Sequence, residues 1–113
     1  MIEAAQLRKN IRELLELLAS EEQQIAYERD VPHVDITREL VSMWFDDQYH
    51  PDDPSLPSSF SSEELAALDE FHRFYGSRAD RLPESKGTVR TWLACPLWRE
   101  IMSQAQHTHE KIA

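Results

Sequence analysis

The clearest helix start in the chain is the stretch Phe60-Ser61-Ser62-Glu63-Glu64-Leu65. Ser61 and Glu64 form an S-x-x-E capping box, in which each side chain satisfies a free backbone amide of the first turn. Phe60 before the cap and Leu65 after it are placed to form a hydrophobic staple. The apolar face then continues through Leu68, Phe71, Phe74 and Tyr75. We therefore predict a helix that begins after Ser61 and stops at Gly76.

Two further helices are predicted before this one. Apolar residues recur at three- and four-residue steps over residues 3–28, where no Gly or Pro interrupts, which indicates one long helix. Pro32 ends it, because proline cannot continue a helix. Asp35 is a good N-cap for a helix over 36–49. The apolar arc of that helix is wide, so either the helix is central in the bundle or part of the arc meets a partner. Residues 50–60 contain three prolines and are predicted to be a stiff loop.

The C-terminal part is predicted to be helical as well. A loop is expected over 79–87, and Thr88 opens a short helical stretch. Pro96 either kinks the last helix or begins a new one, since proline is accepted at a first helical position. No segment alternates apolar and polar residues as a strand does. The 113 residues suit one domain, 1–113. The predicted fold is all-α, an antiparallel bundle of four helices with the last kinked or split at Pro96.

Composition excludes several classes of function. The chain has two glycines, too few for a Gly-rich phosphate loop. Its single cysteine, Cys95, cannot form an internal disulfide and is expected to be a small buried hydrophobe. No stretch approaches the roughly 20 apolar residues of a membrane span. The N-terminal sequence lacks the order of a signal peptide, so we expect a cytoplasmic protein. No carboxylate pair or nucleophile–base spacing suggests catalysis, and no cofactor is expected.

Negative charge is concentrated in one third of the chain. Residues 35–70 hold ten acids and one base, whereas 1–34 hold seven acids and four bases and 71–113 hold four acids and seven bases. The middle segment alone therefore equals the whole chain's net charge of −9. Such a field repels nucleic acid and anionic membranes and favours a cationic partner. We expect a basic protein partner, no nucleic acid and no membrane.

The run Asp46-Asp47-Gln48-Tyr49-His50-Pro51-Asp52-Asp53 is rich in oxygen ligands, which hard cations prefer. It lacks the alternating ligands, central Gly and terminal Glu of an EF-hand loop. Metal binding through residues 46–53 is therefore kept as an alternative, and no metal ligand is assigned. Trp44 lies one turn from Asp47, so it is either a core residue or an aromatic anchor of an interface.

The chain resembles the small helical immunity proteins of bacterial contact-dependent inhibition and polymorphic-toxin systems. The resemblance covers about half of the chain and rests on Leu40-Val41-Ser42-Met43-Trp44-Phe45-Asp46-Asp47-Gln48-Tyr49, the capping box with Phe71, Leu82-Pro83 and Pro96-Leu97-Trp98. It implies a cognate toxin domain held by an acidic surface. The carboxylates expected to face that partner are Asp46, Asp47, Asp52, Asp53, Glu63, Glu64, Asp69 and Glu70, with Tyr49 and Trp44 as anchors.

A second interpretation is a helical adaptor or regulatory subunit, which binds a partner without blocking an activity. A homodimer built on the long first helix belongs to this interpretation. An inhibitor and an adaptor share the acidic docking surface and differ in what binding does to the partner.

Overall fold

The computed structural model describes residues 3–84 and 88–113. These residues form α1 (Ala4–Ala19), α2 (Glu21–Asp30), α3 (Ile36–Ser42), the π-helical segment η1 (Met43–Gln48), α4 (Leu56–Ser59), α5 (Ser62–Ala79), α6 (Val89–Leu93) and α7 (Pro96–Lys111). No strand occurs in this part of the chain, so the predicted all-α class is confirmed. The prediction of four helices is wrong, because short helices replace what the sequence pattern joins into longer ones.

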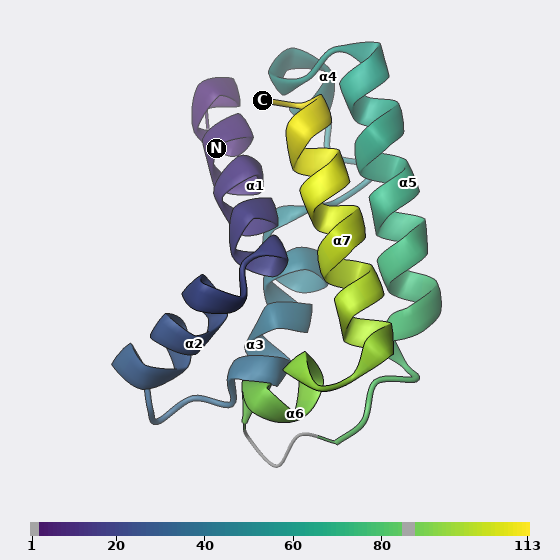
Figure 1. Ribbon diagram of the computed structural model, residues 1–113. Helices are drawn as coiled ribbons and strands as arrows, with labels where there is room; N and C mark the ends of the chain where they lie inside the picture. Colours follow the sequence, from purple (N-terminus) through teal and green to yellow (C-terminus); the bar gives the residue numbers. More distant parts are fainter. Residues whose placement is uncertain (1–2, 85–87) are drawn as a thin grey trace.

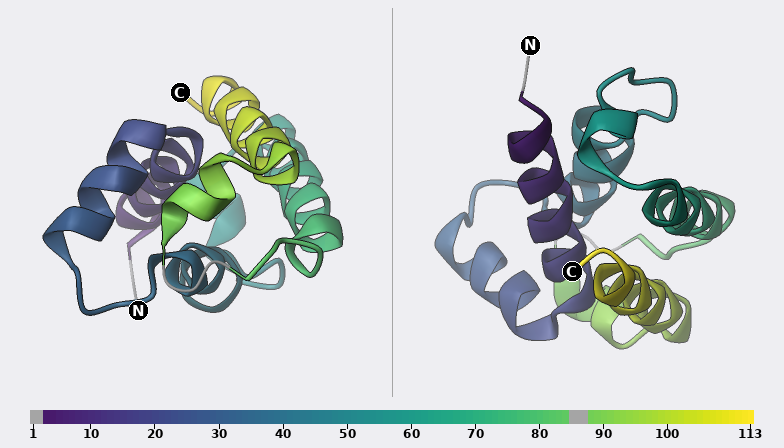
Figure 2. Two further views of the ribbon diagram at one scale, coloured as in Figure 1. Left: turned by 60° about the horizontal axis from the view of Figure 1, so that its bottom comes forward. Right: turned by 90° about the horizontal axis from the view of Figure 1, so that it is seen from above.

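Helix α7 lies between α1 and α5 and packs against both (Figure 1). It runs antiparallel to them, and the view from above shows α5 and α7 side by side with α1 beyond α7 (Figure 2). Helix α3 and η1 lie behind this layer, while α2 and α6 close one end of the molecule. The core consists of the inward side chains of all these elements and includes Trp98, Ile101, Leu15 and Phe71, each 0% exposed.

The predicted single helix over 3–28 is broken at Ser20. The backbone of Ser20 is extended, which lets its hydroxyl accept a hydrogen bond from the Gln23 amide, so Ser20 caps α2. The buried Gln24 side chain fixes the corner, because its amide donates to the carbonyls of Leu17 and Leu18 at 3.1 Å. The Gln24 carbonyl in turn accepts the indole N–H of Trp98, also at 3.1 Å. The free carbonyls at the end of α1 thus find partners inside the protein.

The predicted helix over 36–49 is present but changes its winding at Met43. The Asp35 carboxylate caps it as predicted, accepting the Thr37 hydroxyl at 2.7 Å and the Arg38 amide at 3.4 Å. From Met43 to Gln48 the turns widen to the π form, and the Tyr49 amide donates to the Trp44 carbonyl five residues back, at 3.1 Å. Such wide turns are uncommon in α-helical proteins.

The capping box that opens α5 is confirmed. The Glu64 amide donates to the Ser61 hydroxyl, and the Ser61 amide donates to the Glu64 carboxylate. Two details differ from the prediction. The loop over 50–60 contains the single helical turn α4, and Gly76 does not stop α5, which continues to Ala79. At Gly76 the ring of Phe45 passes close by, 3.7 Å from where a Cβ would lie.

Pro96 separates two helices and does not kink one. It is the first residue of α7, where its missing amide costs no hydrogen bond. Thr88 caps α6 as predicted, and Glu28 of α2 accepts the Val89 amide at 2.7 Å. Of the predicted loop over 79–87, residues 85–87 lie outside the described part. None of the described helices is long and apolar enough to cross a membrane.

Candidate docking surface

The eight carboxylates predicted to face a partner differ in how far they are free to do so. Asp46, Asp47, Asp52, Glu63 and Glu70 are exposed, whereas Asp53, Glu64 and Asp69 are half-buried. The hydrogen bonds of each carboxylate show whether it stabilises the fold or is free to contact a partner.

Trp44 and Tyr49, the two predicted partner anchors, pack in the core, so neither presents an exposed ring in this structure. Trp44 is 0% exposed and Tyr49 3%. Their rings stack with centroids 4.8 Å apart and 11° between the planes, and Phe71 meets Trp44 edge-on at 4.8 Å. The Trp44 indole donates to His72 Nδ1 at 3.2 Å. Helix α5 therefore covers the Trp44 part of the wide apolar arc of residues 36–49 from within the chain, whereas Met43 of the same arc is half-buried.

The contacts of His72 and Tyr49 determine their protonation. Because His72 Nδ1 accepts the indole proton of Trp44, the imidazole is neutral with its proton on Nε2. Burial lowers the pKa of His72, and the charges of Asp69 and Arg73 act in opposite directions on it. Burial and the negative charge of Asp69 both raise the pKa of Tyr49. Both rings are therefore uncharged at neutral pH.

Glu64 serves the fold and is a poor candidate for docking. Besides closing the capping box, its two oxygens accept the two terminal nitrogens of Arg8 at 2.9 and 2.8 Å. Arg8 also donates to the carbonyls of Ser59 and Ile112, so it joins α1 to α4, to α5 and to the C-terminus. Hydrogen bonds from Arg8 and from the Ser61 amide lower the pKa of Glu64 to about 2. Glu64 therefore has a structural role in this fold, and its role at a partner interface stays a prediction.

The loop that follows η1 is shaped by two consecutive turns. The Asp53 amide donates to the His50 carbonyl at 2.9 Å, and the Leu56 amide donates to the Asp53 carbonyl at 3.1 Å. Pro51 and Pro54 each occupy the second position of one of these turns, where their fixed φ is favoured. The Asp53 side chain accepts the Ser55 amide at 2.8 Å. Asp53 thus stabilises the turn, whereas the exposed Asp52 beside it accepts no backbone amide of this loop among the described residues.

This loop forms one wall of an open groove of about 400 Å³, which we call the acidic loop groove. Leu65 and Asp69 of α5 form the other wall. The residues that line it are Tyr49, Pro51, Asp52, Asp53, Pro54, Leu56, Pro57, Leu65 and Asp69, and they include no Lys or Arg. Just outside the groove, Arg73 pairs with Asp69 at 2.9 Å. The fold therefore brings together Asp52, Asp53 and Asp69, although Asp69 is far from the other two in sequence.

A second groove of about 390 Å³ lies between α1 and the α3–η1 segment, and we call it the α1–η1 groove. Three carboxylates line it, Glu13 from α1, Glu39 from α3 and Asp47 from η1. Its other lining residues are Asn10, Leu14, Leu17, Met43 and Gln48. Of these three carboxylates, only Asp47 is among the residues predicted from the sequence to face a partner, since Glu13 lies outside the acidic segment and Glu39 lies outside the 46–53 run.

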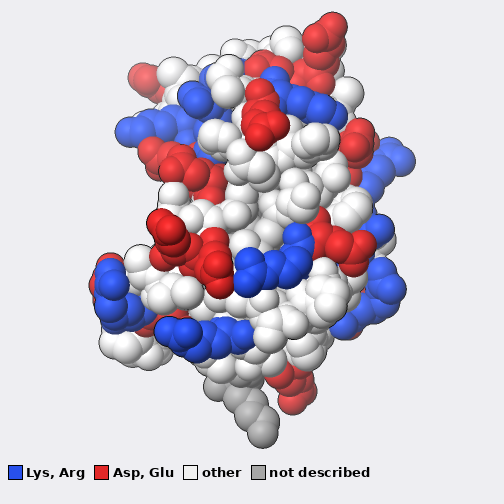
Figure 3. All heavy atoms as spheres, viewed as in Figure 1, with Lys and Arg blue, Asp and Glu red and all other residues white. Residues whose placement is uncertain are grey.

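The remaining predicted carboxylates are not drawn into one surface. Glu70 accepts a hydrogen bond from Gln104 of α7 at 3.3 Å, and Glu63 lies in the first turn of α5 and lines neither groove. The face formed by α1, α7 and α5 shows acidic and basic side chains interspersed (Figure 3). The acidic residues therefore form separate small sites and not a continuous patch on that face.

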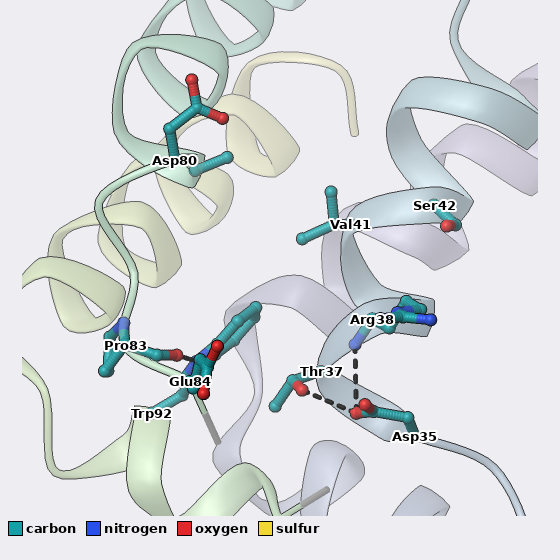
Figure 4. A pocket seen from close by; sticks show the side chains of 10 residues that line it. Asp35, Thr37, Arg38, Val41, Ser42, Asp80, Pro83, Glu84 and Trp92 are labelled. Carbon is teal, nitrogen blue, oxygen red and sulfur yellow. Dashed lines mark hydrogen bonds between the residues drawn. The ribbon is translucent and has the colours of Figure 1, made fainter. Parts of the chain in front are cut away.

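A third pocket, of about 710 Å³, opens between α3 and the segment that follows α5 (Figure 4). Its polar groups are of both signs, with Arg38 beside the capping carboxylate of Asp35 and with Asp80 and Glu84 on the opposite side. The indole N–H of Trp92 donates to the Pro83 carbonyl at 2.7 Å and is not available to a ligand. No signal in the sequence marks this pocket, and its charged groups of both signs do not specify one class of ligand.

No metal centre is evident in the described residues. They contain no group of three or more His, Cys, Asp or Glu side chains placed to hold an ion. The alternative of metal binding through residues 46–53 therefore gains no support from the geometry. The chain matches no protein-family model, no curated protein and no solved structure.

Proposed function

We propose that this chain is a non-enzymatic acidic binding protein that docks a basic protein partner in the acidic loop groove. The observation that carries the proposal is the rigid construction of that groove. Its acidic wall is held by the two proline turns and by the Asp53 side chain, so little loop entropy is lost when a partner binds.

The charge of the groove specifies the partner. Asp52 is exposed and makes no hydrogen bond that supports the loop within residues 3–84 and 88–113, and Asp69 contributes a second carboxylate from α5. Lysine or arginine side chains of a partner would meet these groups with no basic lining residue to repel them. Electrostatic complementarity of this kind accelerates encounter and selects the partner more than it sets raw affinity.

Within this proposal, a bacterial toxin domain neutralised by an immunity protein is the partner class we favour. The charge argument supports it, since such a toxin domain is often basic. An adaptor would use the same surface. The homodimer on the first helix has less support, because the exposed positions of α1 are polar apart from Ala5.

The test is a pull-down from lysate of the source organism, eluted with a salt gradient and read by mass spectrometry. The captured protein's association rate is then measured for the wild type and for Asp52→Asn/Asp69→Asn. A matched control, Glu22→Gln/Glu100→Gln, removes the same charge from exposed sites outside the groove. We expect the groove variant to associate roughly tenfold more slowly at low salt, and the control by much less.

Equal rates for the two variants would show that the partner docks elsewhere. Recovery of the bait alone, with no basic protein, would contradict the proposal and favour the homodimer. If a partner is captured and its enzymatic activity is abolished by stoichiometric binding, the inhibitor interpretation holds; an unchanged activity favours the adaptor.

A further inference from the structure

The α1–η1 groove combines an apolar floor with carboxylates on both walls. Leu17 and Met43 are half-buried and leave apolar area uncovered, and Leu14 beneath them is 6% exposed. The carboxylate of Glu13 stands on one wall and those of Glu39 and Asp47 on the other. Lys9 lies 3.9 Å from Glu13 in a pair whose side chains are both more than 60% exposed, and such exposed ion pairs are weak.

The π winding of η1 keeps the second wall straight. Glu39, Met43 and Asp47 follow one another at four-residue steps. In an α-helix each such step overshoots a full turn by about 40°, so a row of this spacing drifts around the helix. The wider turns of η1 reverse that drift after Met43. An acid, an apolar residue and a second acid therefore stand in line along the groove.

The walls also restrict the conformation of an occupant. Both are helices, whose backbone groups are already bonded along the helix, so an extended peptide would find no strand edge to pair with. A helix brings its own backbone hydrogen bonds and needs only side-chain contacts. A helix that seats apolar residues on Leu17 and Met43 would direct its flanking residues at carboxylates on either side.

We propose that the α1–η1 groove is a docking site for an amphipathic helix of a partner protein, with an apolar stripe flanked on both sides by Lys or Arg. Charge complementarity with Glu13, Glu39 and Asp47 fixes the sign of the flanks. The flexible Met43 side chain suits a floor that adapts to the apolar residues placed on it. This site is separate from the acidic loop groove, and its test does not depend on that groove having a partner.

The probe is a synthetic peptide of about 15 residues, near the length at which an isolated helix becomes marginally stable. It carries Leu at helical spacing with Lys on both flanks, and a second peptide has the same composition in scrambled order. Binding is followed by fluorescence anisotropy, and the contact surface is mapped by chemical-shift changes in the isotope-labelled protein.

We expect the amphipathic peptide to bind at least roughly tenfold more tightly than the scrambled one and to shift resonances of residues that line the α1–η1 groove. Glu13→Gln/Glu39→Gln/Asp47→Asn should weaken binding at least roughly fivefold. Glu22→Gln/Glu100→Gln/Glu110→Gln carries the same charge change on exposed positions elsewhere and should have a smaller effect. Met43→Gln, which leaves the charge unchanged, should also weaken binding.

Equal binding of the two peptides would overturn the proposal, since only net charge would then matter. Shifts confined to residues outside the groove would overturn it as well. Because the mapping uses the wild-type chain, this outcome can be read even if a groove variant is unstable, which its melting curve would show.

Discussion

The Arg8 guanidinium offers a direct test of how the ends of this structure are held together. It donates four hydrogen bonds, two to Glu64 and one each to the carbonyls of Ser59 and Ile112. It also lies 5.2 Å from the centre of the Phe60 ring. We expect Arg8→Met to destabilise the protein, because it removes all four donors and keeps an apolar stem of similar length.

The size of the effect follows from the burial of the pair. The side chains of Arg8 and Glu64 are 30% and 18% exposed, so the bridge lies between a surface pair and a fully buried one. Exposed pairs contribute about 0.2–1 kcal/mol, and breaking a buried pair costs about 3–5 kcal/mol. We therefore expect a loss of about 2 kcal/mol. For a domain of this size that corresponds to a fall of about 8 °C in Tm.

Thermal and urea unfolding, followed by circular dichroism, measure the loss. Arg8→Lys keeps the charge without the two-pronged geometry and should recover only part of it. The matched control is Arg73→Met, because Arg73 is 80% exposed and its one ion pair among the described residues is with Asp69. If Arg8→Met lost no more stability than Arg73→Met, the conclusion that Arg8 ties α1 to α4, to α5 and to the C-terminus would be refuted.

The same pair makes a prediction about acid. The folded-state pKa of Glu64 is about 2, below its ordinary value of 4.5. Its contribution to stability is therefore complete above pH 4.5 and is lost as the pH falls toward 2. Arg8→Met and Glu64→Gln should each flatten the stability curve in this window, and the double variant should cost less than the sum of the two.

Three further perturbations test the interior. Because the pKa of His72 is lowered in the folded state, the unfolded chain takes up a proton at this residue before the folded chain does as the pH falls. The free energy of unfolding should therefore decline below about pH 6.5, and it should decline less in His72→Gln. Urea unfolding at several pH values measures this difference. Gln24→Leu should cost about 1–3 kcal/mol, because it leaves a buried indole donor and two helix-end carbonyls without partners, which urea unfolding would measure. Gly76→Ala should raise stability by about 0.5–1 kcal/mol in thermal melts, since the position is inside α5 and its new Cβ would meet Phe45 at an ordinary 3.7 Å.

Local signals in the sequence predicted the helix starts well. Asp35, Ser61 and Thr88 cap helices as expected, because N-capping depends on a side chain and an amide only a few residues apart. The break at Ser20 carried a comparable signal, since Ser20 is followed by two acids and Gln23 in an S-x-x-Q pattern. The apolar residues continue at helical spacing across Ser20, and this pattern favoured one unbroken helix. The buried Gln24 side chain that fixes the corner is hydrogen-bonded to Trp98, which is far away in sequence.

Helix ends and the anchors were harder to predict. Gly76 suited a stop, but the ring of Phe45 packs beside it and α5 continues. A wide apolar arc on residues 36–49 has two physical explanations, an internal neighbour or an external partner, and periodicity does not distinguish them. At Trp44 the neighbour is internal, because Phe71 and His72 of α5 contact it. The spacing of apolar residues does not predict that contact, because it joins residues far apart in sequence.

The same limit applies to the acidic segment. A count of charges treats its ten acids as equivalent, whereas the fold divides them. Asp35 and Glu64 cap helices, and Asp53 supports a turn, so their oxygens already accept backbone amides. Acids favour such places because free amides gather at helix starts and turns.

What remains for a partner is a smaller and more specific set. Asp52 and Asp69 stand at the acidic loop groove, and Asp47 stands at the α1–η1 groove beside Glu39. Consecutive residues of η1 and the following loop line the two grooves, with Asp47 and Gln48 in one and Tyr49 in the other. One basic protein could therefore reach both grooves from the C-terminal end of η1. A partner engaging both would gain affinity by linking two weak contacts, and loss of either groove would then weaken binding by far more than its own few ion pairs contribute.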